Sequence, residues 1–177
     1  ERIVEHLREF SRQTEPEFTE LDIHYPIENA LMITGQQLLN HNMLIKKRLA
    51  QNLPKIMGDS NQLEQVFLNL ISNARDAMDE VTGPKELTIY TYSTEDEGIP
   101  LVAVSVKDTG EGIPEKNRDK VLEPFFSTKP VGKGTGLGLS LCFGIIEAHG
   151  GRIEIKSQSG KGTEVIILLP AKQSGKE

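Results

Sequence analysis

The sequence predicts an α+β fold of two layers, in which a mixed β-sheet carries helices on one face. Three observations support this class. Apolar residues recur at helical spacing in several segments, other segments alternate polar and apolar residues as strands do, and several strands follow one another as hairpins without strict βαβ alternation. The chain has 177 residues, of which 37% are hydrophobic and 26% charged. This length suits one domain with a short appendage.

The N-terminal half is expected to supply helices and two short strands. In order, we expect the end of an amphipathic helix at residues 1–12, a boundary near 13–20, a helix at 26–39, strands at 43–50 and 54–58, and a helix at 60–80. The last helix is the clearest, because its apolar residues from Leu63 to Met78 follow the period of 3.6. Asp59 can cap it, with Gln62 three residues further on.

The C-terminal half is expected to be richer in strands. We expect strands at 86–93 and 101–107 joined by a loop, a short helix at 115–121, an aperiodic stretch at 123–135, a helix at 136–148, and a hairpin of strands at 151–157 and 163–169. The domain limits follow from these elements. Residues 1–15 are assigned to a helix of another domain, 16–170 to the main domain, and 171–177 to a polar tail expected to be disordered.

Charge and cysteine content narrow the classes of function. The net charge of -6 argues against a nucleic-acid partner, since such proteins are usually basic. The single cysteine, Cys142, cannot form an intrachain disulfide, and a reducing, cytoplasmic setting fits. No apolar run is long enough to span a bilayer, and no signal peptide is recognisable. Because the chain begins with Glu rather than Met, we expect it to be a piece of a longer protein, whose attachment to a membrane is left open.

A polar stripe runs along the expected helix at 60–80. Gln62, Gln65, Asn69, Asn73 and Asp76 fall on one side of that helix, away from the apolar side. A solvated helix face would explain such a stripe. However, asparagine is a weak helix former, and two asparagines four residues apart in mid-helix are unusual. Amide oxygens can ligate Mg²⁺, so a metal site is the alternative.

A second candidate is the segment VKDTGEGIP at residues 106–114. Asp108 shares its strand parity with Val102, Val104 and Val106, so it should point toward the core at the end of the strand. Such a carboxylate needs a donor. It could cap the following turn, or it could accept from the amino group of a ligand that Gly110 and its neighbouring glycine let approach the backbone.

The third candidate is the segment EPFFSTKPVGKGTGLGLSL at residues 123–141. Alternating glycines beside Lys129 and Lys133 precede a helix N-terminus, where exposed amides and the helix dipole favour an anion, above all phosphate. A flexible linker is the simpler interpretation, but linkers seldom carry paired phenylalanines. Neither the P-loop pattern nor the strict G-x-G-x-x-G pattern is present.

Taken together, these three segments resemble sensor histidine kinases. In that family Asn69-x-x-x-Asn73 corresponds to the N box, DTGEGIP to the first glycine box, EPFFSTK to the F box and GKGTGLGL to the second glycine box. The wider group of such ATPases, called GHKL, includes DNA gyrase, heat-shock chaperones and mismatch-repair ATPases. The resemblance covers roughly residues 20–170, and the form of the boxes is similar to that of nitrogen-regulatory bacterial sensor kinases.

The resemblance implies a Bergerat ATP-binding fold that binds ATP and Mg²⁺. Asn73 would hold the metal, Asp108 would accept from the adenine amino group, and the segment from about Glu123 to Thr135 would form a lid. Asn69, Lys129 and Lys133 would take part in catalysis. The full set of residues expected at the nucleotide is Asn69, Asn73, Asp76, Asp108, Gly110, Gly112, Ile113, Phe126, Lys129, Lys133, Gly134, Thr135, Gly136, Leu137 and Gly138.

The implied activity is transfer of the γ-phosphoryl group to a histidine on a separate dimerisation domain, as the first step of two-component signalling. A response regulator would then be a partner, and the full-length protein would be a homodimer. None of the chain's own histidines has the flanking residues of a phosphoacceptor, so we expect structural or surface roles for His6, His24, His41 and His149. A GHKL-type ATPase and a non-catalytic nucleotide-sensing module remain as alternatives. A plain helical dimerisation scaffold would leave the glycine boxes unexplained.

Overall fold

The computed structural model describes residues 15–123, 126 and 138–173. Its main sheet has five strands in the order β2-β4-β5-β7-β6. The strands are β2 (Leu44–Arg48), β4 (Glu86–Asp96), β5 (Ile99–Asp108), β6 (Arg152–Gln158) and β7 (Gly162–Pro170). The β2–β4 pair is parallel and the other pairs are antiparallel, so the sheet is mixed, as predicted.

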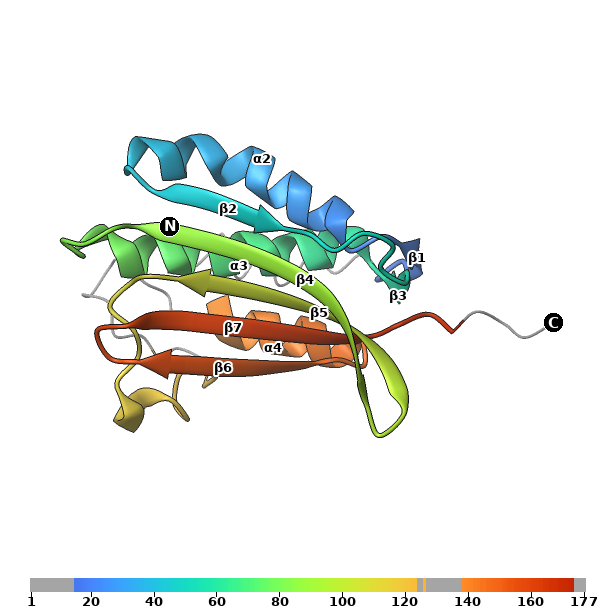
Figure 1. Ribbon diagram of the computed structural model, residues 1–177. Coiled ribbons are helices and arrows are strands. Elements are labelled where there is room, and N and C mark those ends of the chain that lie inside the picture. Colours follow the sequence, from blue (N-terminus) through green and yellow to red (C-terminus); the bar gives the residue numbers. More distant parts are fainter. Residues whose placement is uncertain (1–14, 124–125, 127–137, 174–177) are drawn as a thin grey trace.

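Helices cover one face of this sheet, which confirms the predicted two-layer α+β class (Figure 1). They are α2 (His24–Asn40), α3 (Ser60–Asp79) and α4 (Gly138–Ala148). One hydrophobic core joins the three helices to the inward residues of the strands, with Phe67 of α3 fully buried in it. A smaller apolar cluster lies on the other face, around Ala103 and Leu168. No helix in the part of the chain that the structure describes is both long enough and apolar enough to cross a membrane.

The central helix α3 begins and ends close to where the apolar period predicts. Its buried residues are Leu63, Val66, Phe67, Leu70, Ile71, Ala74 and Met78. Asp59 is the N-cap, and its carboxylate accepts a hydrogen bond of 2.9 Å from the backbone N–H of Gln62. The cap that the sequence suggests is therefore formed.

The strand predicted at 54–58 forms as β3 (Ile56–Gly58), but it pairs with a strand that the sequence did not predict. This partner is β1 (Thr19–Leu21), and the two strands pair antiparallel. Ala171 forms a bridge to Ile56, and the Lys172 N–H donates to the Lys55 carbonyl at 2.7 Å. These two residues, which the sequence assigns to a polar tail, therefore bond to the folded domain.

Two elements differ from their predictions. The loop expected between β4 and β5 is a tight turn at Glu97 and Gly98, which both have positive φ, so the two strands extend further. The helix predicted at 115–121 is reduced to a 3₁₀ turn at Glu115–Asn117. None of the residues of this turn is buried, and the first buried residue after it is Val121. The amphipathic helix expected at 1–12 and most of the aperiodic stretch at 123–135 lie outside the described residues.

Candidate functional site

Asp108 is the last residue of β5 and points into the core layer, as its parity predicts. The residue is 6% exposed. Its Oδ1 accepts the backbone N–H groups of Gly110 at 2.8 Å and Thr163 at 3.3 Å. Within the described part of the chain, no group donates to Oδ2. Burial raises the pKa of Asp108 above its usual value, and the two backbone N–H groups oppose that shift. One oxygen is thus fixed, while the other keeps its capacity to accept.

The turn after Asp108 is held between α3 and the β6–β7 hairpin. A Cβ on Gly110 would lie 2.7 Å from the carbonyl of Ala77 in α3, and the Glu111 N–H donates to that carbonyl at 3.0 Å. Gly112 has φ of +73°, and a Cβ there would lie 2.1 Å from the Gln158 carbonyl oxygen. Only glycine fits at both positions, so the first glycine box is needed for this close approach of backbones.

Two residues of the β6–β7 hairpin complete this turn, and sequence analysis did not assign either. The Ile113 N–H donates to Ser157 Oγ at 2.7 Å. Gly162 has φ of +91°, and a Cβ there would lie 2.1 Å from the Asp108 carbonyl oxygen. The sequence does contain a signal for Gly162. The β6–β7 turn already has a glycine with positive φ at Gly160, so a second glycine two residues later indicates another constraint on the backbone.

The polar stripe of α3 faces α4 around Asn73. A Cβ added to Gly138, the first residue of α4, would lie 3.8–3.9 Å from the two amide atoms of Asn73. The N box and the end of the second glycine box are therefore adjacent. The half-buried Asn73 amide has no hydrogen-bond partner among the described residues, so its oxygen is available to a ligand.

Asn69, one turn earlier, lies against Cys142 of α4. Burial raises the pKa of the Cys142 thiol to about 12, an effect that the nearby Asn69 amide only partly offsets. The thiol donates to the Val66 carbonyl oxygen at 3.7 Å. This cysteine is therefore an unreactive core residue, and Asn69 lies at the contact of α3 with α4.

The remaining predicted site residues are only partly described. Asp76 accepts from Arg75 Nη2 at 3.0 Å, so part of its carboxylate is already committed. Phe126 is half-buried, and its N–H donates to the Glu123 carbonyl at 3.2 Å. The residues that lie outside the described part are Lys129, Lys133, Gly134, Thr135, Gly136 and Leu137.

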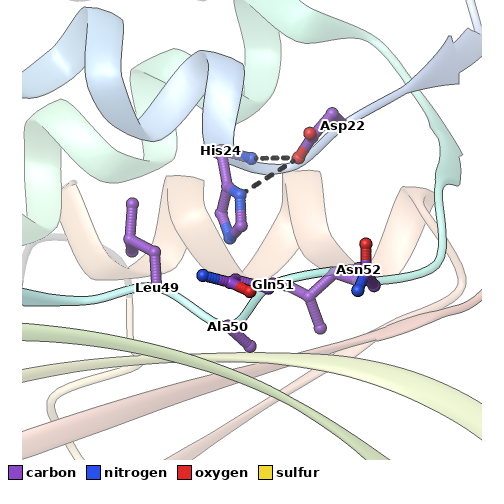
Figure 2. Close-up of a pocket in the computed structure, with 7 residues that line it drawn as sticks. Asp22, His24, Leu49, Ala50, Gln51 and Asn52 are labelled. Carbon is purple, nitrogen blue, oxygen red and sulfur yellow. Dashed lines mark hydrogen bonds and ion pairs between the residues drawn. The ribbon is translucent and has the colours of Figure 1, made fainter.

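Two hollows of the described surface are not centred on this site. One of about 530 Å³ is lined by residues 22, 24 and 49–53 and holds none of the predicted residues. Figure 2 shows His24 and Asp22 facing the 49–52 segment across it, and His24 Nε2 lies 2.9 Å from the buried Thr91 hydroxyl. The other, about 260 Å³ between α2 and α3, reaches Asn69. Asp108, Asn73 and the glycine contacts therefore define the candidate site better than these hollows do.

The side chains at the candidate site suit Mg²⁺ better than they suit a metal ion whose ligands all come from the protein. No group of three or more His, Cys, Asp or Glu side chains in the described residues could hold a metal ion. Mg²⁺ is normally bound by one or two protein oxygens, several waters and the phosphates of a substrate. The Asn73 amide oxygen, to which no described residue donates, is a ligand of that kind, so the residues present fit this ion.

Comparisons with known proteins agree with this arrangement. Residues 58–173 match the family described as histidine kinase-, DNA gyrase B-, and HSP90-like ATPase. Sporulation kinase A of Bacillus subtilis is 50% identical over 145 residues, which is 82% of this chain and 22% of that protein. The solved catalytic domain of histidine kinase ThkA aligns with a TM-score of 0.75 at 31% identity and covers 88% of this chain and 96% of that one. ThkA in complex with the response regulator protein TrrA aligns with a TM-score of 0.75 at 29% identity, covering 97% of this chain and 47% of that one.

The mixed five-stranded sheet with helices on one face and the match to this family define the chain as an ATPase domain. The chain belongs to the histidine kinase-, DNA gyrase B-, and HSP90-like ATPase family. Within that family it is an ATP-binding domain of the sensor histidine kinase type. It spans about a fifth of the length of sporulation kinase A.

Proposed function

We propose that this domain binds Mg-ATP and transfers the γ-phosphoryl group to a histidine on a separate dimerisation domain. The observation that supports the proposal most strongly is that only one of the two carboxylate oxygens of Asp108 accepts hydrogen bonds from described residues. Its Oδ1 is fixed by two backbone N–H groups, and its Oδ2 has no donor within the described chain. A buried carboxylate oxygen without a donor is costly unless a ligand supplies one.

The amino group of adenine is a suitable donor for this oxygen. It carries two N–H groups, whereas guanine has an acceptor oxygen at the corresponding position. Because Gly110 and Gly112 hold the turn firmly against α3 and the β6–β7 hairpin, Asp108 is oriented before the ligand arrives. We therefore assign adenine recognition to Asp108, with Ile113 beside the base.

At the other end of the nucleotide, the phosphates would lie between α3 and the start of α4. Asn73 would hold Mg²⁺, with Asn69 and Asp76 on the same side of α3, and Gly138 leaves room in front of the Asn73 amide. The bound ion would neutralise charge on the phosphates. Lys129 and Lys133 as phosphate contacts, and Gly134 to Leu137 as the phosphate loop, stay predictions.

The asparagine at position 69 favours transfer of the phosphoryl group to a partner over hydrolysis of ATP. An amide cannot act as a general base at neutral pH, so Asn69 cannot activate water for attack on the phosphate. The acceptor must then come from another group. The described histidines have other partners: His24 bonds to Thr91, His41 to Asp79, and His149 to the backbone.

A separate histidine-bearing helical domain is therefore the proposed acceptor, and a response regulator the proposed next partner. The solved complex of ThkA with its response regulator supports the second assignment. A homodimeric parent protein is the corresponding proposal for assembly.

The test is to mix the 177-residue chain with γ-labelled ATP, Mg²⁺ and a separately made histidine-bearing helical domain. We expect acid-labile, base-stable label on the added domain, none on the chain's own histidines, and loss of label with the Asn73→Ala variant. Release of inorganic phosphate without the acceptor would favour an ATPase. ATP binding that needs no Mg²⁺ and gives no label would favour a nucleotide-sensing module.

A further inference from the structure

A second buried polar cluster lies where α4 ends and α3 begins. His149, directly after α4, is 7% exposed. Its Nε2 accepts the backbone N–H of Asp59 at 3.0 Å, and its Nδ1 donates to the Ile145 carbonyl at 2.7 Å. Since a backbone N–H can only donate, the ring must be neutral with its proton on Nδ1. It therefore links the last turn of α4 to the N-cap residue of α3.

The surroundings of the ring favour this neutral form. Burial lowers the pKa of His149 below its usual value, while the bond to Ile145 and the negative charge of Asp59 oppose the shift. The ring also has little room to move. A Cβ on Gly58 would lie 2.9 Å from His149 Cδ2 and 3.1 Å from Leu63 Cδ1. The spacing between the two helix ends is thus set by a closely packed, neutral imidazole.

The segment that leads into the domain contacts the same cluster. Asp59 Oδ1 accepts from the Gln62 N–H at 2.9 Å, and its Oδ2 accepts from the Glu17 N–H at 2.9 Å. The Phe18 ring lies on the His149 ring, with 4.6 Å between centroids. The chain just before β1 is therefore bonded both to the residue that caps α3 and to the ring that joins α3 to α4.

We infer that His149 is a positioning residue for nucleotide binding, which holds α3 and α4 at the spacing that brings Asn73 opposite Gly138. It acts through the Asp59 N–H. The entering segment contacts the same cluster, because the Glu17 N–H donates to the Asp59 carboxylate and the Phe18 ring contacts the His149 ring. This inference rests on the proposed nucleotide site between those helices. A movement of the entering segment would then alter the nucleotide affinity without touching the nucleotide.

Two substitutions distinguish the hydrogen bond between His149 and the Asp59 N–H from the packing of the His149 ring. In the His149→Gln variant, the amide oxygen reaches roughly the position of Nε2 and can accept the Asp59 N–H. In the His149→Asn variant, the shorter amide reaches only the position of Nδ1, so it can donate to Ile145 but leaves the Asp59 N–H unpaired. Both variants lose the ring contact with Phe18, so a role in packing alone would affect them alike.

The measurement is the Kd of the 177-residue chain for Mg-ATP by calorimetry, well below the melting temperature of each variant. We expect the Kd to rise about tenfold for His149→Asn, which corresponds to about 1.4 kcal/mol, and to change less than threefold for His149→Gln. Equal affinities of the two variants would overturn the inference. If wild type binds ATP and the His149→Asn variant binds it equally well, the inference fails while the proposed function stands. If wild type binds no ATP, both fail.

A second variant tests the same link if the His149→Asn protein does not fold. Gly58→Ala would displace the ring from the Asp59 N–H without changing its chemistry, and Gly83→Ala, in an exposed turn with nothing within 4 Å, is the matched control. We expect a weaker Mg-ATP affinity for the Gly58→Ala variant only. Unchanged affinity in a folded Gly58→Ala protein would likewise overturn the role of His149.

Discussion

Asp108→Asn is the most informative substitution, because the structure fixes how the new amide must lie. The Gly110 and Thr163 N–H groups both donate to Oδ1. An asparagine keeps these bonds only if its amide oxygen takes the place of Oδ1. Its NH₂ group then replaces Oδ2 and faces the amino group of adenine, so that two donors meet.

The amide of the Asp108→Asn variant can lie in two orientations, and the one that costs less free energy determines how much affinity for ATP is lost. With the amide unflipped, the complex loses a hydrogen bond to a charged acceptor and leaves donors unpaired, which costs about 3 kcal/mol or more. With the amide flipped, the bond to adenine returns, but two backbone N–H groups lose their acceptor at about 1–3 kcal/mol each. The expected loss is therefore about 2–3 kcal/mol, or roughly 30- to 150-fold in Kd.

Calorimetric titration with Mg-ATP and Mg-GTP measures this directly. The acceptor oxygen of guanine suits the new NH₂ group, so the preference for ATP over GTP should fall even further than the ATP affinity does. Asp96→Asn is the matched control, because Asp96 is half-exposed on β4, forms an ion pair with Arg152 and lies outside the proposed site. An Asp108→Asn protein that binds ATP within twofold of wild type, with the same preference for ATP, would refute the assignment of Asp108 to adenine.

The remaining predictions concern the metal and the glycines. Asn73→Ala should abolish the Mg²⁺-dependent part of the affinity for ATP. The control Asn61→Ala, on the exposed first turn of the same helix, should retain it. Equal dependence on Mg²⁺ in the two variants would exclude Asn73 as the ligand. Gly112→Ala should cost at least about 3 kcal/mol of unfolding free energy, from overpacking and positive φ together. Gly160→Ala, with φ of +77° and nothing within 4 Å, should cost only about 1–2 kcal/mol, and equal denaturant midpoints would contradict this reasoning. Gly144→Ala, within α4 and also with nothing within 4 Å, should raise stability by about 0.5–1 kcal/mol; a lower melting temperature would show a hidden constraint.

The parts of the fold that the sequence predicts are those specified by local pattern. The apolar period locates α3 almost to the residue, and the cap at Asp59 forms as its spacing suggests. Strand parity correctly directs Asp108 inward, because alternation along β5 continues to its last residue. Each of these features depends on residues that are close together in the sequence.

The parts that the sequence does not predict depend on contacts between distant segments. β1 is three residues long and exists through its pairing with β3. The requirement for glycine at Gly110 comes from the Ala77 backbone, and that at Gly162 from the Asp108 carbonyl. The predicted helix at 115–121 is reduced to the turn at Glu115–Asn117 for the converse reason, since that turn has local propensity but no buried residue to support a longer helix. The sequence singled out residues within contiguous motifs, whereas it did not assign Ser157 and Gly162, which only the fold brings to the Asp108 turn.

His149 and Asp108, which are both buried, affect stability in opposite directions as the pH changes. The folded pKa of His149 lies below its ordinary value of 6.5, so its contribution to stability is present above that value and is lost as the pH falls through the folded pKa. The folded pKa of Asp108 lies above its ordinary value of 3.8, so its contribution is present below that value and is lost as the pH rises through the folded pKa. At a pH above both folded pKa values, the neutral histidine therefore supports the fold, while the buried carboxylate weakens it. The Asp108→Asn substitution keeps an acceptor for the Gly110 and Thr163 N–H groups, so it should leave the free protein as stable as wild type or more so. That result would separate a ligand-binding role for this residue from a structural one.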